Sequence, residues 1–208
     1  MGFFISFEGI DGAGKSTQVQ RLARRLTAEG FEVVTVREPG GTPLGETLRE
    51  MLRNPVREID PRAEACLYAA ARAELVARVI LPALRAGKVV LADRFTDSTL
   101  AYQGAGRGLS VAQLSALNAF VTQELSPDCT VIIDLPVAVA LARVGASGER
   151  DRMERLGPAF FSRVREYYLH LSRQDPTRYV VVDGGRAPET VEAEIFRLVR
   201  GALGRCTR

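Results

Sequence analysis

Close to its N-terminus the chain reads Phe3-Phe4-Ile5-Ser6-Phe7-Glu8-Gly9-Ile10-Asp11-Gly12-Ala13-Gly14-Lys15-Ser16-Thr17, an apolar run that passes directly into a glycine-rich turn. The residues after the turn place apolar side chains on one helical face, at Val19, Leu22, Ala23 and Leu26. This order predicts a strand, a loop and a helix. The turn matches G-x-x-x-x-G-K-[ST], in which backbone N–H groups cradle phosphates, the lysine reaches the outer phosphates and the hydroxyl reaches Mg²⁺. The helix that begins there directs the positive end of its dipole at the same anion. The predicted phosphate-binding residues are Gly9, Ile10, Asp11, Gly12, Ala13, Gly14, Lys15, Ser16 and Thr17.

The length and composition limit the class of protein. The 208 residues are 46% hydrophobic, enough to bury one substantial core, so we expect a single domain over residues 1–208. A net charge of +3, with no arginine run longer than two residues, argues against a nucleic-acid surface. Three distant cysteines, Cys66, Cys129 and Cys206, form neither a disulfide nor a metal-binding pattern. Because the sequence shows no leader-like or membrane-length apolar segment, we expect a soluble cytoplasmic protein.

Short apolar runs alternate with helical patterns along the rest of the chain. Further strands are predicted at 31–36, 88–93, 129–135 and 179–183, and helices at 43–52, 60–85, 110–125, 136–144, 160–171 and 188–203. The polar stretch 145–155 lacks periodicity and predicts a mobile loop. Five strands separated by helices predict an α/β fold with a doubly wound parallel sheet. In such sheets the ligand lies outside the carboxyl ends of the strands.

Asp93 and Arg94 follow directly at the end of one predicted central strand. A hard cation takes oxygen ligands, so Asp93 is the expected partner for Mg²⁺ held by Ser16. An arginine fork matches phosphate oxygens in a bidentate way, so Arg94 can hold a second phosphate group. The alternative for Arg94 is a surface salt bridge. The pair therefore suggests two phosphate groups brought together at one sheet edge.

Five segments together resemble those of the thymidylate kinases, in the P-loop nucleoside monophosphate kinase group. They are the stretch 7–17, Arg37-Glu38-Pro39-Gly40-Gly41-Thr42, Tyr68-Ala69-Ala70-Ala71-Arg72, Asp93-Arg94-Phe95 and Ser98-Thr99-Leu100-Ala101-Tyr102-Gln103-Gly104. Their order and spacing are specific, and the resemblance covers nearly the whole chain. It implies a P-loop NTPase-type sheet with a mobile lid and transfer of the γ-phosphoryl group of ATP to dTMP with Mg²⁺, a step that supplies dTTP synthesis.

The resemblance also implies roles for individual residues. Lys15 and the loop amides would hold the ATP phosphates, and Asp11 would lie near the 3′-hydroxyl of the acceptor. Arg37 and Arg94 would hold the acceptor phosphate. The residues implied at the acceptor nucleoside are Tyr68, stacked on thymine; Arg72, at its O4; Ser98, Thr99 and Gln103, near the base; and Tyr102, against a ribose 2′-hydroxyl.

One position departs from part of the family. Some thymidylate kinases carry an arginine inside the phosphate loop, where this chain has Gly12, so the extra cation must come from elsewhere. This resembles the bacterial class, whose lid arginines supply that charge. The lid would cover about 143–155. Our hypothesis is that Arg143 packs against adenine and that Arg150 or Arg152 stabilises the transferring phosphoryl group. A solvated charged loop is the alternative for each.

Two other functions use the same phosphate loop. A GTPase-type switch needs an Asn-Lys-x-Asp base reader, which a chain with lysines only at positions 15 and 88 lacks. A kinase for another pyrimidine nucleotide, or for a free deoxynucleoside, remains an alternative. The family usually forms homodimers, and the helix from about Ala63 to Leu84 could supply the interface. Phosphoryl transfer needs positioning and charge neutralisation, so no catalytic histidine is required.

Overall fold

The computed structural model describes residues 2–56, 58–145, 152–153 and 155–206 of the chain. Its centre is one five-stranded sheet in which every neighbouring pair is parallel, in the order β2-β3-β1-β4-β5. The strands are β1 (Phe3–Glu8), β2 (Val33–Arg37), β3 (Val89–Asp93), β4 (Cys129–Asp134) and β5 (Tyr179–Asp183). Helices separate consecutive strands, as parallel crossovers require. The predicted doubly wound α/β fold is confirmed.

The central strand β1 is buried along its whole length. Its odd-numbered side chains, such as Ile5 and Phe7, belong to the larger core cluster, whereas Phe4 joins a second cluster on the opposite face. Side chains of a strand alternate between faces, so a strand covered on both sides reads as a continuous apolar run. Burial on both faces of the sheet therefore explains why residues 3–7 form an almost continuous apolar run.

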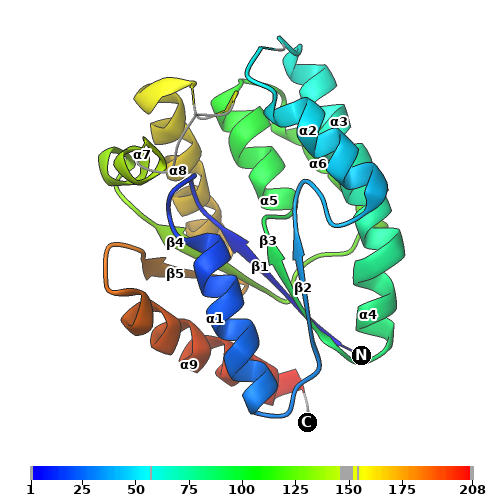
Figure 1. Ribbon diagram of the computed structural model, residues 1–208, viewed down its shortest axis with the longest axis vertical. Helices are drawn as coiled ribbons and strands as arrows, with labels where there is room; N and C mark the ends of the chain where they lie inside the picture. The colour runs from blue at the N-terminus through cyan, green and yellow to red at the C-terminus, as the bar shows by residue number, and fades with distance from the viewer. Residues whose placement is uncertain (1, 57, 146–151, 154, 207–208) are drawn as a thin grey trace.

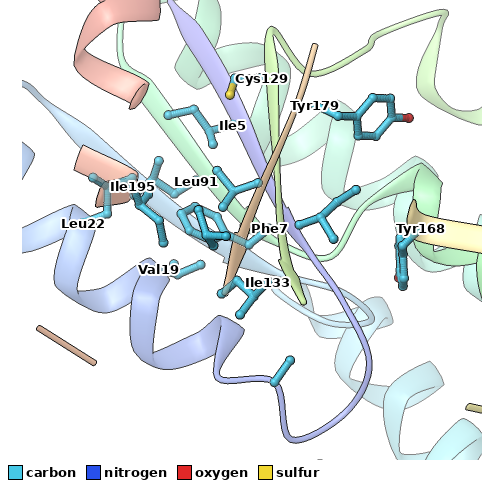
Figure 2. Packing of buried hydrophobic residues seen from close by; sticks show 14 of the residues in the cluster. Ile5, Phe7, Val19, Leu22, Leu91, Cys129, Ile133, Tyr168, Tyr179 and Ile195 are labelled. Carbon is cyan, nitrogen blue, oxygen red and sulfur yellow. The ribbon is translucent and has the colours of Figure 1, made fainter. Parts of the chain in front are cut away.

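Helices α1 (Lys15–Ala28) and α9 (Pro188–Cys206) lie side by side on one face of the sheet (Figure 1). Figure 2 shows Leu22 of α1 and Ile195 of α9 in the same packed cluster as Ile5, Phe7 and Leu91 of the strands. Burying a large apolar side chain contributes about 1.5–3 kcal/mol, so this cluster is a main source of stability. It also fixes the start of α1, and with it the phosphate loop.

The remaining helices connect the strands, and some of them cover the other face of the sheet (Figure 1). They are α2 (Pro43–Arg53), α3 (Pro61–Leu75), the π-helical η1 (Val76–Ile80), α4 (Leu81–Arg85), α5 (Thr96–Thr99), the π-helical η2 (Leu100–Gly106), α6 (Val111–Thr122), α7 (Val137–Gly145) and α8 (Gly157–Gln174). Thr42 caps α2 through the N–H of Gly45, and Ser110 caps α6 through the N–H of Gln113. Threonine and serine are favoured N-cap residues, because their side-chain oxygen accepts from an otherwise unpaired N–H of the first helical turn.

Several elements differ from the sequence prediction by a few residues, and two of the differences have a clear physical cause. The predicted helix over 60–85 is interrupted, because Pro82 has no N–H to donate and the N–H of Leu81 instead reaches back five residues to the carbonyl of Val76. Strand β2 begins at Val33 instead of residue 31, because the N–H of Phe31 is used by the carbonyl of Leu26 at the end of α1. Neither change moves the carboxyl ends of the strands. The described helices include none that is both long and apolar enough to span a bilayer.

Candidate active site

A cavity of about 1000 Å³ opens outside the carboxyl ends of the strands, where the sequence places the ligand. Segments that are far apart in the chain meet in its wall: the phosphate loop, the turn after β2, the ends of α3 and β3, η2, α7 and the turn after β5. The predicted site residues in this wall are Asp11, Gly12, Ala13, Gly14, Lys15, Ser16, Thr17, Arg37, Tyr68, Arg72, Asp93, Arg94, Ser98, Thr99, Tyr102, Gln103 and Arg143. The cavity therefore gathers almost the whole predicted set.

Two predicted phosphate-loop residues do not line the cavity. Gly9 and Ile10 are buried below it, where their carbonyl groups accept hydrogen bonds from Arg94 (3.1 Å) and from the Lys15 ammonium (2.9 Å). Glycine is required in this turn because φ is +137° at Gly9 and +81° at Gly12. A Cβ at Gly12 would lie 2.4 Å from the carbonyl oxygen of Ala140, so an arginine in this loop would clash with α7.

Lys15 is the first residue of α1, and its side chain is enclosed although it lines the cavity. It is only 7% exposed. Burial, followed by the positive charge of Arg94, lowers the pKa of Lys15 to about 8. A lysine whose charge is disfavoured in the empty site gains most from an incoming anion, so this geometry suits a phosphate group.

Ser16 and Asp93 meet across the cavity, and the Ser16 hydroxyl donates a hydrogen bond to the Asp93 carboxylate. The two residues are 77 positions apart and come together because β1 and β3 are neighbours, with Phe7 beside Asp93. A hydroxyl and a carboxylate are the oxygen donors that Mg²⁺ prefers. The described residues contain no cluster of three or more His, Cys, Asp or Glu side chains that could hold a metal. A cation here would therefore draw further ligands from a bound nucleotide.

Arg94 directs its guanidinium group into the cavity from a strained position. Its φ is +75°, which is uncommon for a residue with a side chain. One terminal nitrogen donates to Asp11 Oδ1 (2.6 Å) and to the Tyr102 hydroxyl (2.9 Å), and the other donates to Ser98 Oγ (3.1 Å). Although burial raises the pKa of Asp11, the charges of Arg94 and Lys15 outweigh it and lower this pKa below its ordinary value. Arg94 is thus held in place before any ligand arrives.

Glu8 and Tyr168 support Arg94 from below, and sequence reasoning missed both. The Glu8 carboxylate accepts hydrogen bonds from the N–H of Phe95 (2.7 Å), Ser98 Oγ (2.6 Å) and the Tyr168 hydroxyl (2.9 Å). Burial, followed by repulsion from Asp97, raises the pKa of Glu8 to about 7. The sequence did hold one signal for Glu8, because a charged residue at the end of a mostly apolar strand indicates a role at the sheet edge. Tyr168 gave none, because its spacing in α8 is that of a core residue.

The part of the cavity wall formed by α3, α5 and η2 contains Tyr68, Arg72, Thr99 and Gln103. Arg72 is 1% exposed, and all five of its N–H groups have protein acceptors: the Glu38 carboxylate, the carbonyl of Phe95, and side-chain oxygens at Thr99 (2.8 Å) and Asn118 (2.7 Å). A ligand carbonyl can reach Arg72 only by sharing an N–H group that Arg72 already donates. The resemblance implied the contact but not this network.

The predicted lid arginines lie in different surroundings. Arg143 donates to the carbonyl of Gly184 (3.3 Å) and reaches that of Gly12 (3.5 Å), at the cavity wall. Arg150 lies outside the described residues, as do 146–151 and 154. Arg152 does not line the cavity: it is 9% exposed, its Nη1 lies 2.5 Å from Glu64 Oε2, and its Nε donates to the carbonyl of Leu52 (3.1 Å). The charge of Arg152 is paired here with a buried carboxylate, and its catalytic role stays a prediction.

The cavity also contains functional candidates that the sequence reasoning did not single out. Arg49 and Arg53 project from one face of α2 and line the cavity near Arg37. Burial lowers the pKa of Arg49, and the charges of Arg53 and Arg37 lower it further. The four-residue spacing of Arg49 and Arg53 was a readable signal. Together with Lys15 and Arg94 these side chains give the cavity a positive field that favours phosphate groups.

Comparisons with known proteins agree with this geometry. The thymidylate kinase family model matches residues 7–195. The chain is 52% identical over 204 residues to a thymidylate kinase of Pseudomonas putida (strain W619), covering 98% of this chain and 99% of that protein. It is 48% identical over 198 residues to a thymidylate kinase of Deinococcus radiodurans, covering 95% and 96%. The crystal structure of thymidylate kinase from Ehrlichia chaffeensis superimposes with a TM-score of 0.78 at 34% identity, over 95% of this chain and 98% of that one.

Proposed function

The chain belongs to the thymidylate kinase family, and we infer that it is an enzyme that transfers the γ-phosphoryl group of ATP to dTMP, giving dTDP and ADP. The observation that carries this inference is the meeting of Lys15, Asp93 and Arg94 in one cavity of about 1000 Å³. A kinase for a free deoxynucleoside would have no use for Arg94 beside Arg37, and a switch protein would need no acceptor pocket. Neither alternative is favoured.

The donor is held by the phosphate loop and the start of α1. Loop N–H groups and the Lys15 ammonium neutralise the triphosphate, and the helix dipole adds to their field. The oxygen donors of Ser16 and Asp93 fit Mg²⁺, which when bound would neutralise charge on the triphosphate. At the far end, Arg143 and Arg186 line the cavity and are positioned for the adenine. Cation–π contact with an aromatic base is a common use of arginine.

The acceptor phosphate is held by Arg94 and Arg37. The ion pair between Arg94 and Asp11 fixes the guanidinium fork in advance, so little conformational freedom is lost on binding. Asp11 also accepts a hydrogen bond from Tyr102 and is positioned for the sugar 3′-hydroxyl. Tyr102 is buried beside Phe160 and Phe161. Its fixed ring leaves little space for an additional ribose 2′-hydroxyl and favours deoxyribose.

The acceptor base is bound between Tyr68 and the polar groups of Arg72, Ser98, Thr99 and Gln103. The tyrosine ring supplies a stacking face, and burial raises the pKa of Tyr68, which keeps its hydroxyl neutral. Arg72 shares one of its N–H groups with the base O4. We assign the whole of 1–208 to one thymidylate-kinase-like domain with a lid at about 143–155. Arg150 and Arg152 are the candidates in this lid for the cation that the transferring phosphoryl group requires.

The enzyme forms a homodimer through α3 and α6, which pack against each other. Their outer surfaces expose small apolar residues and two large ones, Val111 and Phe120, of which Phe120 is 82% exposed. Covering one phenylalanine contributes about 1.5–3 kcal/mol, so this residue is a suitable anchor for a second copy. The substrates ATP and dTMP and the lack of a disulfide pattern fit a cytoplasmic enzyme. Light scattering on Phe120→Asp against wild type tests the dimer, which the substitution would convert to monomer.

Product analysis tests the proposed reaction. After incubation with ATP, Mg²⁺ and dTMP, ³¹P NMR should show new resonances of dTDP and ADP in equal amounts. Lys15→Ala should abolish them, whereas substitution of the surface lysine, Lys88→Ala, should not. Formation of ADP and inorganic phosphate without dTDP would show that the protein hydrolyses ATP and does not use this acceptor.

A further inference from the structure

Glu64 is a fully buried carboxylate that none of the assigned roles uses. It lies in the first turn of α3 and is 0% exposed. Its Oε1 accepts a hydrogen bond from Gln103 Nε2 (2.8 Å), and its Oε2 accepts one from Arg107 Nη2 (2.9 Å) and lies 2.5 Å from Arg152 Nη1. A buried carboxylate is tolerated only when it is paired and hydrogen-bonded. The two arginines supply the pairing, and Gln103 is the neutral partner.

The contact determines which end of the Gln103 amide faces the cavity. A carboxylate paired with guanidinium groups offers only acceptors, so the amide must present its NH₂ group to Glu64. The carbonyl oxygen Oε1 is then the polar atom that Gln103, a residue of the cavity wall, has left for a ligand. Without a fixed acceptor beside it, a glutamine amide can turn over and present a donor instead.

We propose that Glu64 is a positioning residue that sets the base preference of the acceptor site by holding the Gln103 amide in one orientation. This inference rests on the proposed dTMP site. With Oε1 facing the ligand, the site accepts a hydrogen bond from the N3–H of thymine or uracil. It rejects cytosine, because the N3 of cytosine is itself an acceptor and two acceptors would face each other. The preference is therefore set by a side chain that does not touch the base.

Arg107 and Arg152 contact Glu64 as well, but they hold its carboxylate in place and do not take their orientation from it. They approach Oε2 most closely, Arg107 from the end of η2 and Arg152 from the lid segment, and they hold the carboxylate against the side of the pocket. Removing one of them weakens the support of Glu64 but leaves the amide facing an acceptor. Variants at these positions therefore separate loss of packing from loss of amide orientation.

The test compares kcat/KM for dTMP with kcat/KM for dCMP on the same enzyme preparation, so that the fraction of folded enzyme cancels in the ratio. Glu64→Gln should lower this ratio by about tenfold or more, because its amide can present either a donor or an acceptor to Gln103. The matched control Arg107→Gln should keep the ratio within about threefold of wild type. In a Gln103→Leu background, adding Glu64→Gln should change the ratio by less than about twofold.

Two results would overturn the proposal: a ratio for Glu64→Gln within about threefold of wild type, or an equal fall in the ratio with and without Gln103. If Glu64→Gln alone does not fold, Glu64→Gln with Arg107→Gln replaces it, since the pair removes one positive charge together with the negative one. A wild-type enzyme that does not turn over dTMP would contradict the proposed function instead. Activity of the wild type alone decides that question, so the two failures can be distinguished.

Discussion

The lowered pKa of Lys15 predicts that ATP binding weakens as the pH rises above 8. In the empty site, burial and the neighbouring Arg94 hold this pKa at about 8, whereas a bound triphosphate restores the charged form. The ammonium must therefore be protonated before or during binding. The apparent Kd for ATP then rises about fivefold between pH 8 and pH 9, and by about tenfold for each further pH unit. Phosphate groups titrate near pH 6, so ATP itself does not change charge in this range.

The lowered pKa of Lys15 has the opposite effect on the stability of the ligand-free protein, which should increase as the pH rises. Between pH 8 and the ordinary lysine value of 10.5, the folded state binds fewer protons than the unfolded state, so this group's contribution to stability rises with pH. At pH 7 the buried charge destabilises the fold by up to about 3 kcal/mol. Lys15→Met should therefore bind ATP poorly and yet unfold at a higher denaturant concentration at pH 7. Part of this gain in stability is offset because the variant loses the hydrogen bond to the carbonyl of Ile10.

Calorimetric titration with ATP in two buffers of different ionisation enthalpy measures both the Kd and the protons taken up. At pH 8 the wild type should take up about half a proton for each ATP bound. The chain offers a matched control, because Lys88 is its only other lysine and pairs with Glu32 at the surface. Lys88→Met should keep the wild-type pH dependence. A Kd that stays flat from pH 8 to pH 9.5, or a pH dependence that survives in Lys15→Met, would refute the reasoning.

Three further predictions concern the loop, the metal and the acceptor. In urea titrations, Gly12→Ala should lower the unfolding free energy by about 2–4 kcal/mol, because its Cβ meets the carbonyl of Ala140. The control Gly87→Ala has a similar φ of +78° but lies in open space, so it should lower the unfolding free energy by only about 1–2 kcal/mol. Asp93→Asn should raise the Mg²⁺ concentration for half-maximal rate by about tenfold or more, and an unchanged Mg²⁺ titration would remove Asp93 from the metal site. Tyr102→Phe loses the hydroxyl contacts to Asp11 and Arg94, so KM for dTMP should rise about tenfold while KM for ATP stays within about twofold; equal rises in both KM values would show general loss of packing.

The sequence predicted the features that depend on local pattern and on the geometry of parallel sheets. Ser16 and Asp93 could be paired because each follows a strand, and the carboxyl ends of parallel strands meet at one edge. The starts of α2 and α6 were predicted to within one residue, and Thr42 and Ser110, which cap them, are favoured N-cap residues. The proposed acceptor residues, such as Tyr68, come from the family resemblance, because no spacing rule identifies them.

Contacts between distant elements could not be predicted in this way. Tyr168 reaches Glu8 across 160 positions of sequence, and only the packing of α8 on the sheet brings their hydroxyl and carboxylate together. Arg152 looked like a free lid cation because the polar stretch around it has no periodicity. Its partner Glu64 lies on α3, far away in the sequence, and no local pattern marks Glu64 as the partner of Arg152. Buried polar networks depend on tertiary packing more than on local pattern.

The most direct test of the central claim is the rate of ADP release with ATP and Mg²⁺ over a panel of acceptors: dTMP, dUMP, dCMP, dGMP, dAMP, UMP and thymidine. The account predicts strong preference for dTMP, weaker use of dUMP, which lacks only the methyl group, and no activity in Lys15→Ala. Turnover of thymidine or a purine monophosphate in preference to dTMP would keep the phosphate loop but contradict the roles given to Tyr68, Arg72 and Tyr102.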